Sequence, residues 1–102
     1  MSVIYVEPAQ KAKEILPLIR SAIESEIAKL QFALQTASKR LIPYEKKYDV
    51  TSDHFITKMV AEDLDGGDDE YVDWAGEYKL MQRLKHRLQR LQEIQYVDSV
   101  IL

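Results

Sequence analysis

Cysteine is absent from the 102-residue sequence, and glycine and proline occur only three times each. The lack of cysteine excludes a disulfide framework, a thiolate metal site and a cysteine nucleophile, and it is compatible with a reducing compartment. No run of residues approaches the roughly 18 apolar positions of a membrane-spanning helix, and the first residues lack the basic start and apolar run of a signal peptide. We therefore expect a cytoplasmic protein that makes no membrane contact.

Neither sign of charge is in large excess, since the net charge is −3 with 30% charged residues. The 46% hydrophobic content is that of a folded protein rather than a disordered one. So small a net charge gives no global attraction to nucleic acid or to an anionic membrane. The length is that of one domain, which we expect to cover residues 1–102.

Apolar residues alternate in steps of four and three between residues 23 and 44, which is a heptad pattern. It predicts a long helix with one buried seam. Pro17 and Pro43 each lack a backbone N–H and crowd the carbonyl four residues earlier, so we expect the helix to lie mostly between them. The predicted seam consists of Ile23, Ile27, Leu30, Leu34, Ala37, Leu41 and Tyr44.

A short amphipathic helix is expected after residue 50, with Thr51 or Ser52 as its N-cap. The sequence DGGDD at residues 65–69 then favours a turn, because paired glycines and aspartates disfavour a helix. The apolar face of the short helix would consist of Phe55, Ile56, Met59 and Val60.

A second long helix is predicted over residues 69–95, with a seam formed by Trp74, Tyr78, Met81, Leu84, Leu88 and Leu91. The predicted fold is therefore mainly α: an antiparallel hairpin of two long helices with a short intervening helix, which becomes a bundle on oligomerisation. Six aromatic residues near the hairpin tip are expected to form a buried plug rather than a ligand site. They are Tyr44, Tyr48, Phe55, Tyr71, Trp74 and Tyr78.

The two ends of the chain are rich in β-branched residues and tyrosine, which pack well on a pleated surface. An antiparallel hairpin would bring residues 2–6 beside residues 96–102, running in opposite directions. The pattern thus predicts a small β ribbon that pairs the two termini.

A second stripe lies opposite the seam of the first long helix, at Ser21, Ser25, Ala28 and Phe32. Small residues let helices approach closely, and a phenylalanine among them can anchor an interface. We expect this stripe to be an oligomer interface; the alternative is an isolated surface phenylalanine.

Cations occupy the outer face of the second long helix, at Lys79, Arg83, Arg87 and Arg90. Such a row can contact phosphates in nucleic acid or acidic groups on a partner. It can equally be a solvated face whose cations favour the C-terminal end of the helix dipole. The aromatic and base-reading residues of a nucleic-acid surface are missing beside it, which favours the solvated face.

Eight carboxylates and no lysine or arginine lie between Glu62 and Glu77. Their spacing does not match a calcium-binding loop, because Asp68 stands where that loop requires glycine. Two interpretations remain: a solvated turn whose acids complement the helix dipole, or an acidic patch that docks on a basic partner.

No arrangement of residues points to catalysis or to a cofactor. His54 and His86 are the only histidines and fall on different predicted helices, and no Ser, His and Asp spacing suggests a triad. The pair Gly66–Gly67 lacks the lysine and serine or threonine of a phosphate-binding loop. We expect a non-enzymatic protein without metal or cofactor.

The sequences YEKKYDVTSDHF (residues 44–55) and DDEYVDWAGEYKLMQRLKHRLQRLQ (residues 68–92) resemble those of short helical prokaryotic proteins, encoded beside small toxins and regarded as antitoxin-like. The shared pattern covers roughly residues 20–95: a heptad helix, a capped short helix with phenylalanine, an acidic turn and a leucine-rich helix. Asp49 stands where this pattern commonly has glycine. The resemblance implies a protein partner, with a small toxin as its class, but supplies no functional residues.

The leading hypothesis is a protein-protein interaction module that self-associates into a dimer or larger oligomer and binds a protein partner. A small nucleic-acid-binding accessory protein, acting through the basic face of the second long helix, is the alternative. An enzyme subunit whose site is completed across an oligomer is the third hypothesis.

Overall fold

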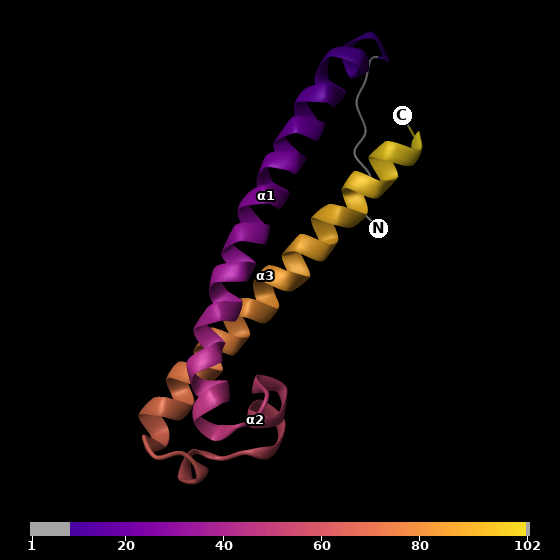
Figure 1. Cartoon of the computed structure of the whole chain (residues 1–102). Helices are drawn as coiled ribbons and strands as arrows, with labels where there is room; N and C mark the ends of the chain where they lie inside the picture. Colours follow the sequence, from indigo (N-terminus) through magenta and orange to yellow (C-terminus); the bar gives the residue numbers. More distant parts are fainter. Residues whose placement is uncertain (1–8, 102) are drawn as a thin grey trace. The chain divides into compact units, whose positions relative to one another are not determined.

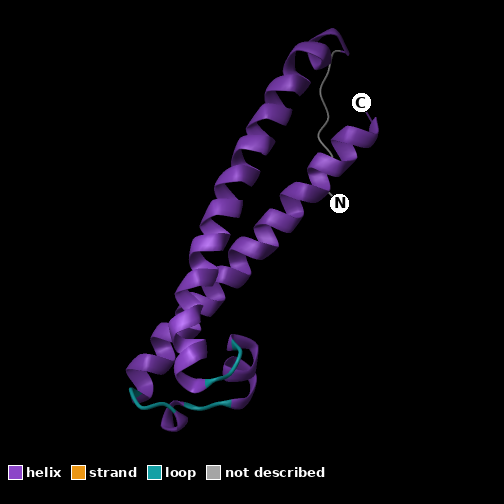
Figure 2. Cartoon of the chain, in the orientation of Figure 1, coloured by secondary structure: helices purple, strands orange, loops and turns teal. Residues whose placement is uncertain are grey.

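A computed structural model describes the backbone of residues 9–101 and the side chains of residues 13–95. The elements follow one another as α1 (Ala9–Tyr48), α2 (Ser52–Lys58), a 3-10 turn (Ala61–Asp63) and α3 (Gly67–Ile101) (Figure 1). Within the described backbone there is no strand (Figure 2). The predicted order of a long, a short and a second long helix is confirmed.

Most of the helix α1, 25 of its 40 residues, lies between Pro17 and Pro43 as expected, but the helix continues through both prolines instead of starting or ending near them. Each proline removes one backbone hydrogen bond from a helix of 40 residues. Once a helix has nucleated, each further residue adds a bond at little cost, so the neighbouring turns keep the helix intact.

The C-terminal end of α1 is a left-handed turn at Asp49, whose φ is +53°. The N–H of Val50 donates to the Glu45 carbonyl at 3.2 Å, which is the six-to-one bond of a Schellman motif. Glycine adopts this backbone conformation without steric cost, whereas aspartate adopts it at some cost. The departure from glycine at this position therefore leaves the cap geometry intact.

The short helix α2 begins as predicted, because the Thr51 side chain accepts a hydrogen bond from the His54 N–H at 3.1 Å. It ends at Lys58, earlier than expected, and Met59 and Val60 have extended backbones. The Asp63 carboxylate accepts the Val60 N–H at 2.9 Å and so starts the 3-10 turn instead of a further turn of α2.

The helix α3 begins at Gly67, whose φ is +62°, just before the acidic residues of its first turn. It continues to Ile101, so the predicted strand over residues 96–102 is wrong for residues 96–101. Extending an existing helix needs no new nucleus, and this outweighs the weak β preference of the branched residues there. The other predicted strand, residues 2–6, lies outside the described residues, and no β ribbon is supported.

The chain divides into two compact units. Unit 1 comprises Met1–Phe32 and Lys85–Leu102, and unit 2 comprises Ala33–Leu84. In unit 1 the buried residues of the two predicted seams are Ile27, Leu30 and Leu88. An ion pair between Glu26 and Arg87, with 3.6 Å between their side-chain atoms, also joins α1 to α3 there.

In unit 2, residues later in α1 contact residues earlier in α3. Arg40 is paired with Glu77, and Lys47, later in α1, is paired with Glu70, earlier in α3. The two helices are therefore antiparallel here, as predicted. The core of unit 2 consists of Leu41, Phe55, Leu64, Trp74 and Ala75.

Candidate interaction surfaces

Trp74 is the centre of the predicted aromatic plug and is completely buried. Its ring stacks on Phe55 of α2, with 3.8 Å between the ring centroids, and on Tyr44 and Tyr48 of α1 at 5.3 and 5.7 Å. Stacked aromatic rings of this size bury large apolar areas. The plug is a packed core that holds α2 against both long helices, and not an open ligand site.

A partly buried series of hydrogen bonds accompanies the plug. The indole N–H of Trp74 donates to the Ser52 hydroxyl at 2.9 Å, and that hydroxyl donates to the Glu45 carboxylate at 3.0 Å. The backbone N–H of Ser52 donates to the same carboxylate oxygen at 2.9 Å. One carboxylate thus caps the start of α2 and orients the serine that accepts from the tryptophan. The sequence offered no local signal for these hydrogen bonds, because they join three separate helices, α1, α2 and α3.

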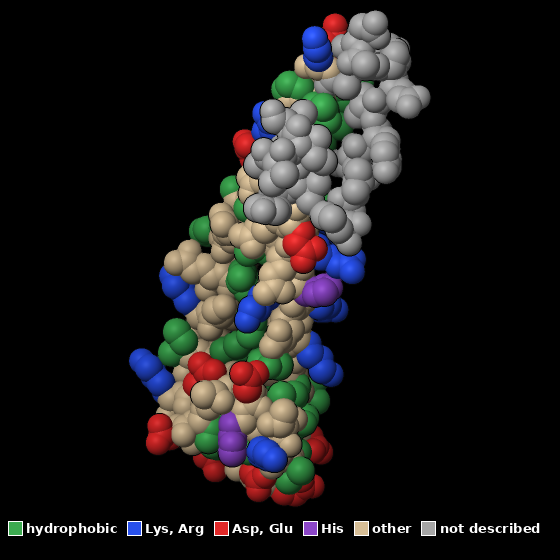
Figure 3. Space-filling view, turned by 90° about the vertical axis from the view of Figure 1, so that its right-hand side faces the viewer, with side chains coloured by type: hydrophobic (Ala, Val, Ile, Leu, Met, Phe, Trp, Pro, Cys, Tyr) green, Lys and Arg blue, Asp and Glu red, His purple; other side chains and the backbone are tan. Residues whose placement is uncertain are grey.

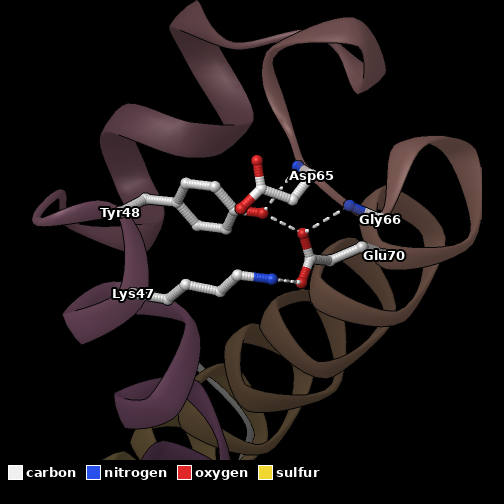
Figure 4. A network of polar contacts seen from close by, with 5 residues as sticks. All are labelled: Lys47, Tyr48, Asp65, Gly66 and Glu70. Atoms are coloured by element: carbon white, nitrogen blue, oxygen red, sulfur yellow. Dashed lines mark hydrogen bonds and ion pairs between the residues drawn. The ribbon is translucent and has the colours of Figure 1, made fainter.

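A second polar network joins α1 to the start of α3 (Figure 4). Glu70 accepts hydrogen bonds from Lys47 at 2.8 Å, from the Tyr48 hydroxyl, and from the backbone N–H of Gly66 at 3.3 Å. The Tyr48 oxygen in turn accepts the N–H of Asp65 at 2.9 Å. The network therefore fixes the turn that precedes α3.

These contacts shift the protonation equilibria of the two charged partners. The hydrogen bonds from Lys47 and Tyr48 stabilise the carboxylate and lower the pKa of Glu70. The hydrogen bond to Glu70 raises the pKa of Lys47. Both groups are therefore more firmly charged in the folded protein than in an exposed chain.

Two further tyrosines of the plug are held in their neutral form. The pKa of Tyr78 is raised, first by its hydrogen bond to Asp53 and then by burial. The pKa of Tyr44 is raised mainly by burial and then by the negative charge of Asp73. Because their shifts follow from contacts of the core, neither tyrosine is marked as a reactive group.

Among the described residues, no group of three or more histidine, cysteine or acidic side chains is placed to hold a metal ion. His54 donates its backbone N–H to the cap of α2, and its side chain is exposed. The side chain of His86 is exposed on α3.

The carboxylates between residues 62 and 77, which we call the acidic turn, divide into two groups. Three of them bind within the chain: Asp63 to the Val60 N–H, Glu70 to Lys47, and Glu77 to Arg40 at 3.8 Å. The other five are exposed, and acidic side chains gather at the lower end of Figure 3. These five are Glu62, Asp65, Asp68, Asp69 and Asp73.

The four residues of the predicted α1 stripe are all exposed in unit 1. Phe32 leaves 73% of its surface exposed, and Leu18 leaves 70%. At 100° per residue, Leu18 and Phe32 point about 40° apart, and the stripe lies about 170° around the helix from the seam. Sequence reasoning missed Leu18, although its spacing of two heptads from Phe32 was a usable signal. We call Leu18, Ser21, Ala22, Ser25, Ala28 and Phe32 the α1 stripe.

The four predicted cations of α3 are also exposed. Lys79 and Arg83 belong to unit 2, whereas Arg87 and Arg90 belong to unit 1. Arg87 is paired with Glu26 at 3.6 Å, so one of the four has an acidic neighbour within the chain.

Comparisons with known proteins add no identity, because no family model, no curated protein and no solved structure matches the chain. In the described part of the chain, none of the helices combines the length and the apolar character needed to cross a bilayer.

Proposed function

We propose that the protein is a non-enzymatic interaction module that self-associates through the α1 stripe and binds a protein partner. The observation that carries the proposal is the exposure of two large apolar side chains on one face of unit 1, Leu18 and Phe32. Single exposed apolar residues are ordinary, but two on the same helical face with small residues between them form a surface suited to another helix.

The order of residues along the α1 stripe supports a second copy of this chain as the neighbour. The stripe is symmetric about Ser25. Ala22 and Ala28 are each three residues from it, and Leu18 and Phe32 are each seven residues from it. An antiparallel copy with a twofold axis at Ser25 would place Phe32 of one chain beside Leu18 of the other. The small residues between them would let the two helices approach closely.

A protein partner is supported by the resemblance to antitoxin-like proteins and by the exposed acids. Five carboxylates of the acidic turn have exposed side chains. Such a patch speeds and orients association with a basic protein surface. The partner that we propose is therefore a basic protein, and a small toxin is the class that the resemblance implies.

Nucleic-acid binding through α3 remains the second candidate, carried by the exposure of Lys79, Arg83 and Arg90. Carboxylates at Asp69 and Asp73 on the same helix would repel a phosphate backbone. A labelled random duplex titrated at physiological salt separates the candidates. Tight binding that is lost when the arginines become glutamine would favour nucleic acid, whereas we expect none.

The absence of native cysteine allows a direct test of self-association. Under mild oxidation, a Ser25→Cys variant should form a disulfide between copies, because the proposed twofold axis brings the two Cβ atoms together. Ser38→Cys, an exposed position of α1 outside the stripe, is the matched control and should remain mostly reduced. Equal cross-linking of both variants, or none in either, would contradict the proposed contact.

The partner is tested by capture from the native cell with a tagged chain. One protein recovered in stoichiometric amount, and retained after nuclease treatment, would support the module. Nuclease-sensitive material would support the second candidate. A metabolic enzyme would support the hypothesis of an enzyme subunit.

A further inference from the structure

The charges on the outer face of α3 are spaced so that they destabilise the isolated helix. Asp69 and Asp73 are four residues apart, as are Lys79 and Arg83, and like charges at this spacing destabilise a helix. All four side chains are exposed, and none of them makes an ion pair within the described part of the chain. The helix dipole favours Asp69 in the first turn, but its effect does not extend to the other three.

Gly76 stands midway between these two groups and is itself unusual. It is exposed in the interior of a 35-residue helix, where glycine is the poorest helix former apart from proline. A Cβ atom at this position would meet nothing within 4 Å, so packing within the chain does not require glycine. A glycine on an open helix face permits another backbone to come close.

We propose that the α3 face, formed by Asp69, Val72, Gly76, Leu80 and Arg83, binds the same face of a second copy. At 100° per residue, Asp69 and Arg83 point about 20° to either side of Gly76. Val72 and Leu80 point about 40° to either side, and Val72 is 66% exposed.

A twofold axis at Gly76 makes this face complementary to itself. Asp69 and Arg83 are each seven residues from Gly76, so Asp69 of one copy lies level with Arg83 of the other. The axis generates this ion pair twice, about 10 Å along the helix on either side of the crossing point. The two Gly76 residues, one from each copy, meet where the two α3 helices cross, and a side chain at this position would hold the helices apart.

The balance of charge selects a second copy over other occupants. A nucleic acid would meet the carboxylate of Asp69 on this face and that of Asp73 beside it, and a purely basic or purely acidic protein would be repelled by half of the face. Only an occupant with the opposite order of charges satisfies both halves, and an antiparallel copy of α3 has that order. One helix face is small for an interface, so we expect rapid exchange and micromolar affinity.

This contact is separate from the α1 stripe, which lies on another helix and in unit 1. Two different twofold contacts on one chain produce assemblies larger than a dimer. The two can be tested independently, because Phe32→Glu disrupts the α1 stripe and leaves the α3 face unchanged.

The test uses sedimentation of the full chain carrying Phe32→Glu, with Arg83→Asp and Asp69→Arg added separately. Each added change places like charges across the axis, and we expect dissociation constants at least roughly tenfold weaker than for Phe32→Glu alone. In an equimolar mixture of the two variants, a copy with aspartate at both positions 69 and 83 can pair with a copy with arginine at both positions. The mixture should regain the parent affinity within about threefold.

Two controls separate the α3 face from a general effect of charge or folding. Lys85→Asp makes the same charge change on the opposite side of α3 and should leave association unchanged. Gly76→Leu should retain the helical circular dichroism signal but lose association. A Phe32→Glu protein that stays monomeric at several hundred micromolar, or two variants that do not recover on mixing, would overturn the proposal.

Discussion

Trp74 and Ser52 are linked by a buried hydrogen bond of 2.9 Å, in which the indole N–H donates to the serine hydroxyl. Ser52 is 3% exposed and Trp74 is not exposed at all, so neither group can turn to water when its partner is removed. This contact is one of those that join α2 to α3, while the bonds from Ser52 to Glu45 join α2 to α1.

Ser52→Ala should therefore destabilise the protein by about 1–3 kcal/mol, because it leaves the Trp74 N–H buried without an acceptor. Urea unfolding followed by tryptophan fluorescence measures the change. Ser38→Ala, at an exposed position of α1, is the matched control and should change the free energy of unfolding by less than about 0.5 kcal/mol. Equal effects at both positions would mean that the buried bond contributes little.

Leu88→Ala should cost about 2–5 kcal/mol, since the side chain is buried in unit 1 and its removal leaves a cavity. Leu84 is only half-buried, so Leu84→Ala should cost clearly less. Chemical denaturation of the two variants under identical conditions gives the comparison. A larger loss at Leu84 would show that the seam of α3 is centred elsewhere.

Asp49→Gly should stabilise the protein by about 0.5–1 kcal/mol, because glycine relieves the left-handed backbone but adds some entropy to the unfolded chain. Thermal and urea unfolding both report the gain. Asp49→Ala keeps a Cβ atom at the same φ and serves as the control, which should show no gain. Destabilisation by glycine would indicate that the aspartate side chain contributes to the cap.

The contact of Glu70 with Lys47 predicts how stability depends on pH. The pKa of Glu70 is lowered from its usual 4.5, so its contribution is present above that value and is lost as pH falls through the folded pKa. The pKa of Lys47 is raised from 10.5, so its contribution is present below 10.5 and is lost as pH rises through the folded pKa.

Unfolding of wild type and Glu70→Gln, measured across the pH range, tests this dependence. The difference in free energy between them should be constant near neutral pH and should shrink in acid below 4.5. Glu62→Gln, at an exposed position of the acidic turn, should match wild type at every pH. If the free energy of unfolding falls by the same amount in acid for wild type and Glu70→Gln, Glu70 is not the source of the loss.

The helical part of the fold could be read from the sequence because it depends on periodic burial. The positions Ile27, Leu30 and Leu88, assigned to the seams by spacing alone, are buried. The helix boundaries could not be read in the same way. Extension of α3 to Ile101 depends on the low cost of adding residues to an existing helix, which local β preference does not reveal.

Several polar contacts of the plug and of the turn before α3 were beyond sequence reasoning, because they join residues more than 20 positions apart, as in Lys47 with Glu70 and Ser52 with Trp74. Surface features were more accessible, since helical spacing alone predicted the stripe at Ser25 and Phe32. The α3 face could be recognised only from the structure, which shows that Asp69, Val72 and Arg83 are exposed, that Leu80 is half-buried, and that the space around Gly76 is open.

Self-association through the α1 stripe is tested most directly by sedimentation of wild type and Phe32→Glu at low micromolar concentration. Phe32 is 73% exposed, so the substitution should leave the fold and the unfolding midpoint of the single chain unchanged. We predict that wild type sediments as a dimer or a larger species and that Phe32→Glu shifts it towards the monomer. A wild type that is monomeric at this concentration, with a mass and a stability that Phe32→Glu does not alter, would contradict the proposed function.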